Sequence, residues 1–284
     1  MSVRIIVDSS TDVGEQYRSR IEVVPLTLHF GDQEYFDGVT IDKQEFYRKL
    51  VESDVLPTTS QATPAMFDSV FREVAAAGDS AVVICLSSKL SGTYQSACIA
   101  AEDYENIYVV DSLSVAIGTG VLAEYAVRCA EEGMPALLIA SLVTQRREDI
   151  CVIALLDTLE YLKKGGRISK TVAFAGGVLN IKPVVTVTEG EVTLIGKARG
   201  SRNGNNLLVE KIRQAGGVDF TLPVLLGYTG LSSALLDKYV EDSRELWKDA
   251  LEEIPRSLLC SVIGTHVGPG AVAAAFFKKG ECHL

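Results

Sequence analysis

Several residue types are scarce in this sequence of 284 residues, and each scarcity excludes a kind of site. There are three histidines and six cysteines, with no CxxC pair and no Cys/His cluster at zinc-binding spacing. Four cysteines lie within apolar runs: Cys85, Cys98, Cys129 and Cys260. This pattern is typical of reduced core residues, so we expect a cytoplasmic protein with no disulfide framework, no metal and no cofactor.

Basic charge and long apolar runs are also scarce. The chain has 27 Lys and Arg against 37 Asp and Glu, a net charge of −10. Nucleic acid and anionic membranes repel such a protein, so neither is expected as the main partner, and membrane contact is at most transient. No charge-free apolar stretch is long enough to cross a bilayer, and the first residues show no signal-peptide pattern. We expect no transmembrane segment.

The first half of the chain alternates strand-like apolar runs with helical periods. Strands are predicted over 3–8, 21–26, 81–86 and 107–111, helices over 43–53, 65–78, 91–104 and 115–132, and a small strand-and-loop excursion over 29–42. Strands rich in β-branched residues that alternate with helices predict a Rossmann-like parallel sheet with helices on both faces.

The second half has a different pattern. Strands are predicted over 151–156, 184–196, 221–229 and 257–264, and helices near 202–215, 231–252 and 270–278. The run 184–196 contains the turn sequence TEGE, which predicts a hairpin and therefore a mixed or antiparallel sheet. We expect two α/β domains, residues 1–148 and 149–284.

Three short loops are rich in hydroxyl groups or glycine. They are PTTSQ (57–61), SSKLSGTY (87–94) and GTHVGPG (264–270). In doubly wound sheets, ligands bind outside the carboxyl ends of strands, where loops meet helix N-termini. Hydroxyls and free N–H groups in such loops can hold an anion without a lysine. None of the loops contains a Walker A motif, and the chain has no GxSxG nucleophile motif.

The same residues have structural interpretations as well. Ser91 is typical of a helix N-cap, and Thr59 and Ser60 are typical of hydroxyl–backbone turns. His266 lies between glycines that allow close approach of a ligand, but a structural histidine is an equal alternative. The basic segment EYLKKGGRISK (160–170) is either a solvated helix end or a docking surface for an acidic or phosphate-bearing partner.

Six short motifs together resemble those of the DegV family. They are DSSTD (8–12), TTSQ (58–61), LSGTYQSA (90–97), EYLKKGGRIS (160–169), LNIKP (179–183) and GTHVGPG (264–270). They occur in order from the first predicted strand to the last predicted helix, so the resemblance covers essentially the whole chain. One departure is Ala62, where a proline commonly follows TSQ in the family.

The resemblance implies a lipid-binding protein that is not itself an enzyme. The family fold is a two-domain α/β structure that holds one long-chain fatty acid in a tunnel between the domains. The resemblance places the fatty acid carboxylate on hydroxyls of Thr59 or Ser60 and of Ser91, with His266 nearby.

Further contacts and a partner follow from the same resemblance. It implies secondary ligand contacts at Gly92 and Thr93 and places Arg167 near the pocket mouth, where it could contact a partner. Family members called FakB present the fatty acid to a separate fatty acid kinase, which uses ATP to form the acyl phosphate. The same partner is therefore expected here.

Two other functions stay open at this point. One is an acyl or phosphoester hydrolase or transferase, with Ser91 as nucleophile and His266 as base. The other is a carrier of a different hydrophobic carboxylate, with the same donors at the same loops.

Overall fold

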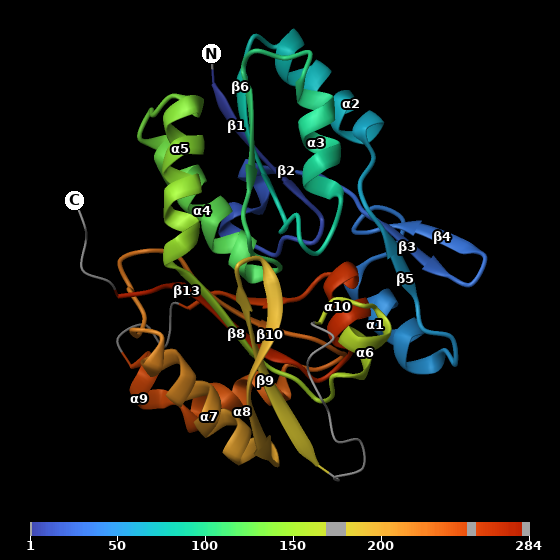
Figure 1. The fold of residues 1–284 in the computed structure, drawn as a ribbon, viewed down its shortest axis with the longest axis vertical. Helices are drawn as coiled ribbons and strands as arrows, with labels where there is room; N and C mark the ends of the chain where they lie inside the picture. The colour runs from blue at the N-terminus through green and yellow to red at the C-terminus, as the bar shows by residue number, and fades with distance from the viewer. Residues whose placement is uncertain (1, 169–179, 249–253, 280–284) are drawn as a thin grey trace.

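Helix α4 (Ile117–Glu131) lies between two β-sheets, one from each half of the chain (Figure 1). The computed structural model describes residues 2–168, 180–248 and 254–279. One side of α4 packs on strands of the first sheet and the other side on strands of the second, so most of its residues are buried. The hydrophobic core of the first half therefore continues through α4 into the second sheet.

The first sheet is parallel, as predicted. Its strands occur in the order β2 (Ile21–Val24), β1 (Val3–Asp8), β6 (Ser80–Cys85) and β7 (Ile107–Asp111). Helices α2 (Pro64–Ala76) and α3 (Thr93–Ala101) cover one face, and α4 and α5 (Ala136–Arg146) cover the other (Figure 1). The predicted Rossmann-like arrangement is confirmed, and α5 is a helix that the sequence patterns did not indicate.

A second, smaller sheet is antiparallel and projects from the first half. Its strands occur in the order β4 (Gln33–Phe36), β3 (Thr27–Phe30) and β5 (Thr58–Ser60), next to helix α1 (Lys43–Glu52). The short 3₁₀ helix η1 (Glu15–Arg20) contacts β2 and α4 instead. The excursion over 29–42 is confirmed. The prediction that 57–61 is a loop is wrong, because residues 58–60 complete this sheet by pairing with β3.

The sheet of the second half has six strands and is mixed, as predicted. The order is β10 (Glu191–Arg199), β9 (Ile181–Thr188), β8 (Ile150–Leu155), β13 (Val272–Phe277), β11 (Val224–Tyr228) and β12 (Arg256–Leu258), and among these pairs only β11 and β12 are parallel. Helices α7 (Ser201–Gln214) and α8 (Ala234–Asp242) cover the face opposite α4. The domain boundary near residue 148 stays a prediction.

Two element types near the C-terminus were predicted wrongly. The run 257–264 was expected to be one strand, but β12 ends at Leu258 and helix α10 (Ser261–Val267) begins three residues later. The run 270–278 was expected to be a helix, but it contains β13, a central strand buried on both faces. Short apolar runs that are buried on every side have no periodicity that separates helix from strand, and packing overrides alanine's helix propensity.

The helix predicted over 231–252 is interrupted. Helix α8 ends at Asp242, and α9 (Arg244–Trp247) follows after a single residue, Ser243. The Ser243 hydroxyl donates to the carbonyl of Tyr239 and accepts from the indole N–H of Trp247 at 3.1 Å. A serine that bonds back to the preceding turn favours a bend at this point. Residues 249–252 of the predicted helix lie outside the described residues.

The hairpin between β9 and β10 reaches back to the first half of the chain. Its turn is the predicted one, with Glu189 and Gly190 at positive φ values of 51° and 84°. The buried hydroxyl of Ser87 donates to the carbonyl of Gly190 at 2.7 Å. This contact brings the first residues of β10 next to the loop that follows β6.

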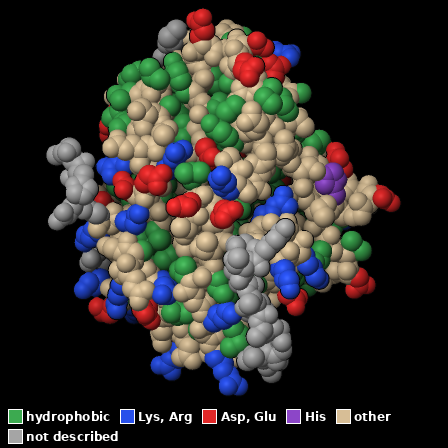
Figure 2. Space-filling view, viewed as in Figure 1, with side chains coloured by type: hydrophobic (Ala, Val, Ile, Leu, Met, Phe, Trp, Pro, Cys, Tyr) green, Lys and Arg blue, Asp and Glu red, His purple; other side chains and the backbone are tan. Residues whose placement is uncertain are grey.

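Charged and apolar side chains are both exposed on the face shown in Figure 2. Acidic and basic side chains are interspersed there, and apolar side chains lie over α5, where Leu137 and Leu138 are exposed. Within the described residues, no helix is both long and apolar enough to cross a membrane.

Close packing of α4 leads to a test of the fold. A Cβ atom added at Gly120 would lie 1.9 Å from the backbone oxygen of Asp12, which cannot rotate away. We expect Gly120→Ala to lower the free energy of unfolding by about 3 kcal/mol through overpacking, measured by urea denaturation. Ser141→Ala at an exposed position of α5 is the control and should change the stability little. Equal stabilities of the two variants would contradict this account of the α4 contact.

Candidate functional site

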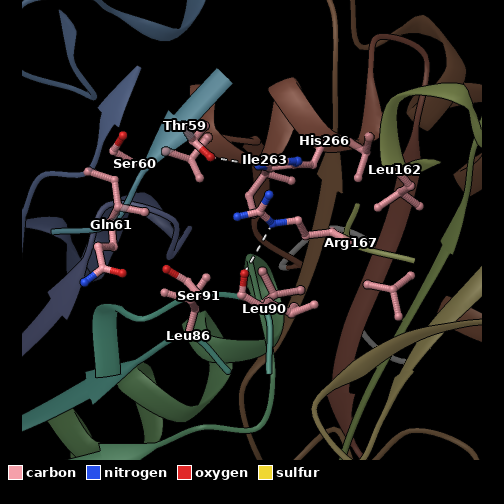
Figure 3. Close-up of a pocket in the computed structure, with 15 residues that line it drawn as sticks. Thr59, Ser60, Gln61, Leu86, Leu90, Ser91, Leu162, Arg167, Ile263 and His266 are labelled. Carbon is pink, nitrogen blue, oxygen red and sulfur yellow. Dashed lines mark hydrogen bonds between the residues drawn. The ribbon is translucent and has the colours of Figure 1, made fainter. Parts of the chain in front are cut away.

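A cavity lies where β5, the loop after β6, helix α10 and strand β10 meet (Figure 3). It encloses about 580 Å³ of space between atoms, part of which is open to solvent. Its walls are mostly aliphatic and come from both halves of the chain: Leu26, Leu86, Leu90, Val115, Leu162, Val192, Val262, Ile263 and Val267. The polar lining residues are Thr59, Ser60, Gln61, Ser91, Arg167 and His266.

Strand β5 directs two neighbouring hydroxyls to opposite sides. The Thr59 hydroxyl lies 2.9 Å from Nε2 of His266, whereas the Ser60 hydroxyl lies 2.9 Å from Nε2 of His29 on the small sheet. Figure 3 shows Thr59 pointing toward His266 and the Ser60 hydroxyl pointing away from it. The alternation of side chains along a strand produces this difference. Of the two hydroxyls that the sequence left as alternatives, only that of Thr59 is directed toward His266.

Ser91 precedes helix α3 and lines the cavity. Its hydroxyl lies 2.9 Å from the Thr93 hydroxyl and accepts from the N–H of Thr93 at 3.3 Å. Gly92 occupies the N-cap position that was expected for Ser91. A Cβ atom at Gly92 would lie 2.1 Å from Oε1 of Gln61, so the close approach of Gln61 requires glycine there. Gly92 and Thr93 lie behind Ser91 and are not among the cavity-lining residues.

The loop that carries Ser91 is held by two carboxylates at strand ends. Asp8 accepts from the N–H of Leu86 at 2.7 Å, and Asp111 accepts from the N–H of Ser88 at 3.2 Å. Both carboxylates therefore accept hydrogen bonds from the backbone of this loop. Among the described residues there is no group of three or more His, Cys, Asp or Glu that could hold a metal ion.

His266 lies in the last turn of α10 and is neutral near pH 7. Burial, with a smaller contribution from the positive charge of Arg167, lowers the pKa of His266 from 6.5 to about 4. Its Nδ1 atom is buried and has no hydrogen-bond partner among the described residues. A Cβ atom at Gly165 would lie 2.3 Å from Nδ1, so this glycine makes room for the ring.

Arg167 is the one cationic residue among those that line the cavity. Its Nε donates to the carbonyl of Leu90 at 3.3 Å, and one terminal nitrogen donates to the carbonyl of Gly165 at 2.6 Å. Figure 3 shows the side chain extending between the Thr59–His266 pair and Leu90. The basic segment therefore divides: Lys163 is exposed at the end of α6 (Glu160–Lys164), while Arg167 belongs to the cavity. Lys170 lies outside the described residues.

Thr59, Ser91, Arg167 and His266 together form what we call the polar end of the cavity. It brings two hydroxyls, a neutral imidazole and a guanidinium into a cavity whose other lining residues are mostly aliphatic. The sequence motifs indicated all four residues. They did not indicate the aliphatic wall, because Val192 and Leu162 reach the cavity only through the arrangement of the two halves.

A hydrolase that used Ser91 as nucleophile and His266 as base would need these two side chains to be paired, and the structure pairs them differently. His266 Nε2 pairs with Thr59, and the Ser91 hydroxyl pairs with Thr93. Within the described residues, no hydrogen bond joins Ser91 to His266. A mostly apolar cavity with a few polar groups is typical of a small-molecule binding site.

The fold is that of an α/β protein with three sheets, and its cavity combines aliphatic walls with a few polar side chains. A family model described as an uncharacterised protein, DegV family, matches residues 2–279. The chain belongs to the DegV family.

Relatives of known sequence or structure agree with this assignment. A DegV domain-containing protein of Caldanaerobacter subterraneus is 36% identical over 283 residues, which is 98% of this chain and 99% of the relative. A DegV-family protein of Thermus thermophilus, described by its fatty acid binding, has a TM-score of 0.85 at 30% identity and covers 98% of this chain and 100% of its own. A stearic acid-binding protein of Eubacterium ventriosum has a TM-score of 0.86 at 26% identity, covering 98% and 99%.

The environment of His266 leads to a prediction about pH. Because the pKa of His266 is lowered from 6.5 to about 4, the unfolded chain takes up a proton at this residue before the folded protein does as pH falls. We therefore expect His266 to lower the stability progressively between pH 6.5 and 4, by about 3 kcal/mol at most.

An NMR titration of the histidine ring protons in the ligand-free protein checks the prediction, with His266→Asn used for assignment. A midpoint near 4 is expected for His266. A midpoint at or above 6.5 would contradict the buried, neutral state.

Proposed function

We propose that this protein binds one long-chain fatty acid in the cavity, with its carboxylate at the polar end. The observation that carries the proposal is a lining of nine aliphatic side chains into which Thr59, Ser91, Arg167 and His266 bring polar groups. The carboxylate would accept from the hydroxyls of Thr59 and Ser91 and from the guanidinium of Arg167, which form charge-assisted hydrogen bonds. The solved relatives that are described as binding fatty acids support the same ligand class.

The tail and the carboxylate of the fatty acid would contribute differently to binding. Each methylene removed from water contributes about 0.8 kcal/mol, so the tail supplies most of the affinity. The polar end determines the orientation, because a carboxylate in the aliphatic part of the cavity would lack donors. His266 suits this role in its neutral form: it adds a hydrogen-bonding group without a second buried positive charge beside Arg167.

The first test is chemical identification of the ligand. Protein purified from a bacterial host is expected to release a fatty acid on denaturing extraction, detected by mass spectrometry. Preparations that are repeatedly free of ligand and also fail to take up palmitate or oleate would falsify the proposal.

A pair of threonine variants tests the orientation. Thr59→Val keeps the shape of the side chain and removes its hydroxyl, so we expect about tenfold weaker oleate binding, the loss of about one charge-assisted hydrogen bond. Thr58→Val is the matched control, because Thr58 lies on the same strand, is exposed and does not line the cavity. Titration calorimetry measures both. Equal dissociation constants for the two variants would remove Thr59 from the carboxylate site.

We further propose that the loaded protein presents the carboxylate to a fatty acid kinase. The kinase would transfer the γ-phosphoryl group of ATP to a carboxylate oxygen, which yields the acyl phosphate and ADP. Orientation of the carboxylate at one defined end of the cavity is what a partner that acts on it requires. We infer a cytoplasmic setting, because the five cysteines among the described residues are free.

A reconstitution experiment tests this partnership. With a bacterial fatty acid kinase, ATP and the oleate-loaded protein, we expect acyl phosphate that is trapped as the hydroxamate. The protein with ATP alone should give none, and neither should the kinase with free oleate. Formation of acyl phosphate by this protein without the kinase would contradict its role as a carrier.

A further inference from the structure

One short segment connects the second sheet to the helix that carries His266. It runs over 258–261, from the end of β12 to the start of α10. Each of its four residues makes one hydrogen bond to a side chain from the first third of the chain. The carbonyl of Leu258 accepts from Nζ of Lys43 at 2.7 Å, and the carbonyl of Leu259 accepts from Oη of Tyr47 at 3.1 Å. The N–H of Cys260 donates to Oδ2 of Asp12 at 3.0 Å, and the N–H of Ser261 donates to Oδ1 of Asp37 at 3.3 Å. Four side chains distant in sequence thus hold the base of α10.

An ion pair lies at the centre of these contacts. Lys43 Nζ is 2.6 Å from Oδ1 of Asp12, whose side chain is fully buried. Burial opposes the charged form of Lys43, but Asp12 and Cys260 together more than offset it and raise the lysine pKa, so the amine stays protonated. Each member of the pair uses a second bond to hold the segment, Asp12 at Cys260 and Lys43 at Leu258.

The ion pair borders a second hollow on one side. This hollow, with about 810 Å³ of space that is partly open to solvent, is lined by Asp12, Asp37, Lys43 and Cys260. Asp12, Cys260 and Ser261 are themselves buried, so a hydrogen bond lost here would leave a buried polar group without a partner. The ion pair supplies two of the four side-chain hydrogen bonds to the segment, at Leu258 and Cys260.

The other end of α10 has little freedom to compensate. The helix is seven residues long, so its start lies only about 8 Å from His266 at 1.5 Å of rise per residue. In its middle, a Cβ atom at Gly264 would lie 2.5 Å from the ring of Phe46 and 2.7 Å from Oη of Tyr47. A displacement of the base of α10 is thus passed on to the His266 ring.

We propose that Asp12 and Lys43 are positioning residues for the polar end of the cavity. They hold the base of α10, and through this helix they set the His266 ring within hydrogen-bonding distance of Thr59. The inference rests on the proposed fatty acid site. It also gives a role to Asp12, the last residue of the DSSTD motif, which does not line the cavity itself.

Three variants test the proposal: Asp12→Asn, Lys43→Met and the double variant. Asp12→Asn leaves the Lys43 charge unpaired and frees the base of α10. We expect about tenfold weaker binding of oleate and no more than about a twofold change for oleyl alcohol, which lacks the carboxylate. In the ligand-free protein, the NMR-measured pKa of His266 should rise from about 4 toward 6.5 as the ring becomes accessible to water.

The control and the double variant separate positioning from general destabilisation. Asp42→Asn is next to Lys43, is exposed and keeps a side chain suited to the cap of α1, so it should change neither readout. If a single variant fails to fold, the double variant Asp12→Asn/Lys43→Met removes both charges and avoids the unpaired one. It should show the same loss of oleate affinity and the same rise in pKa.

The outcomes are distinct. Variants that fold, keep the His266 pKa near 4 and keep the ratio of oleate to oleyl alcohol affinity would overturn the positioning role. Failure of the parent protein to bind oleate would instead overturn the proposed function. The pKa comparison would then still decide whether the ion pair sets the His266 ring, because it requires no ligand.

Discussion

The packing of α4 between the two sheets is the contact on which the remaining structure depends. The helix is buried on both sides, and the absence of a side chain at Gly120 lets it approach the backbone of Asp12. This approach fixes the loop after β1 relative to the second sheet. Since the cavity has walls from both halves, its shape depends on how closely α4 draws them together. The cavity is thus a product of helix packing as much as of its own lining.

The net charge of the polar end also depends on burial. Arg167 is the only cation among the lining residues, and burial keeps His266 neutral. The polar end therefore carries one positive charge, which would balance the carboxylate of the proposed ligand and leave no excess charge in a low-dielectric space. A lysine in place of His266 would add a second charge with a desolvation cost of its own. The hydroxyls of Thr59 and Ser91 complete the donors without adding charge.

Local patterns predicted most of the first half of the fold, because its strands are short runs of β-branched residues between clear helical periods, such as 3–8 and 107–111. They failed where burial removed periodicity: 261–267 is a helix and 272–277 a central strand, although both are short apolar runs. The motifs predicted ligand contacts at Thr59 or Ser60, at Ser91 and at His266, and placed Arg167 near the pocket mouth. They could not show that Ser60 faces His29, since this depends on the register of β5 against β3.

The four residues of the polar end come from positions 59, 91, 167 and 266, which lie on separate segments of the chain. A ligand held by all four would act as a noncovalent cross-link between these segments. Binding to the folded state alone stabilises a protein in proportion to the logarithm of ligand concentration. The loaded form would then resist unfolding and proteolysis better than the empty form. In a cell, the amount of this protein would consequently follow the supply of its ligand, without any change in its synthesis.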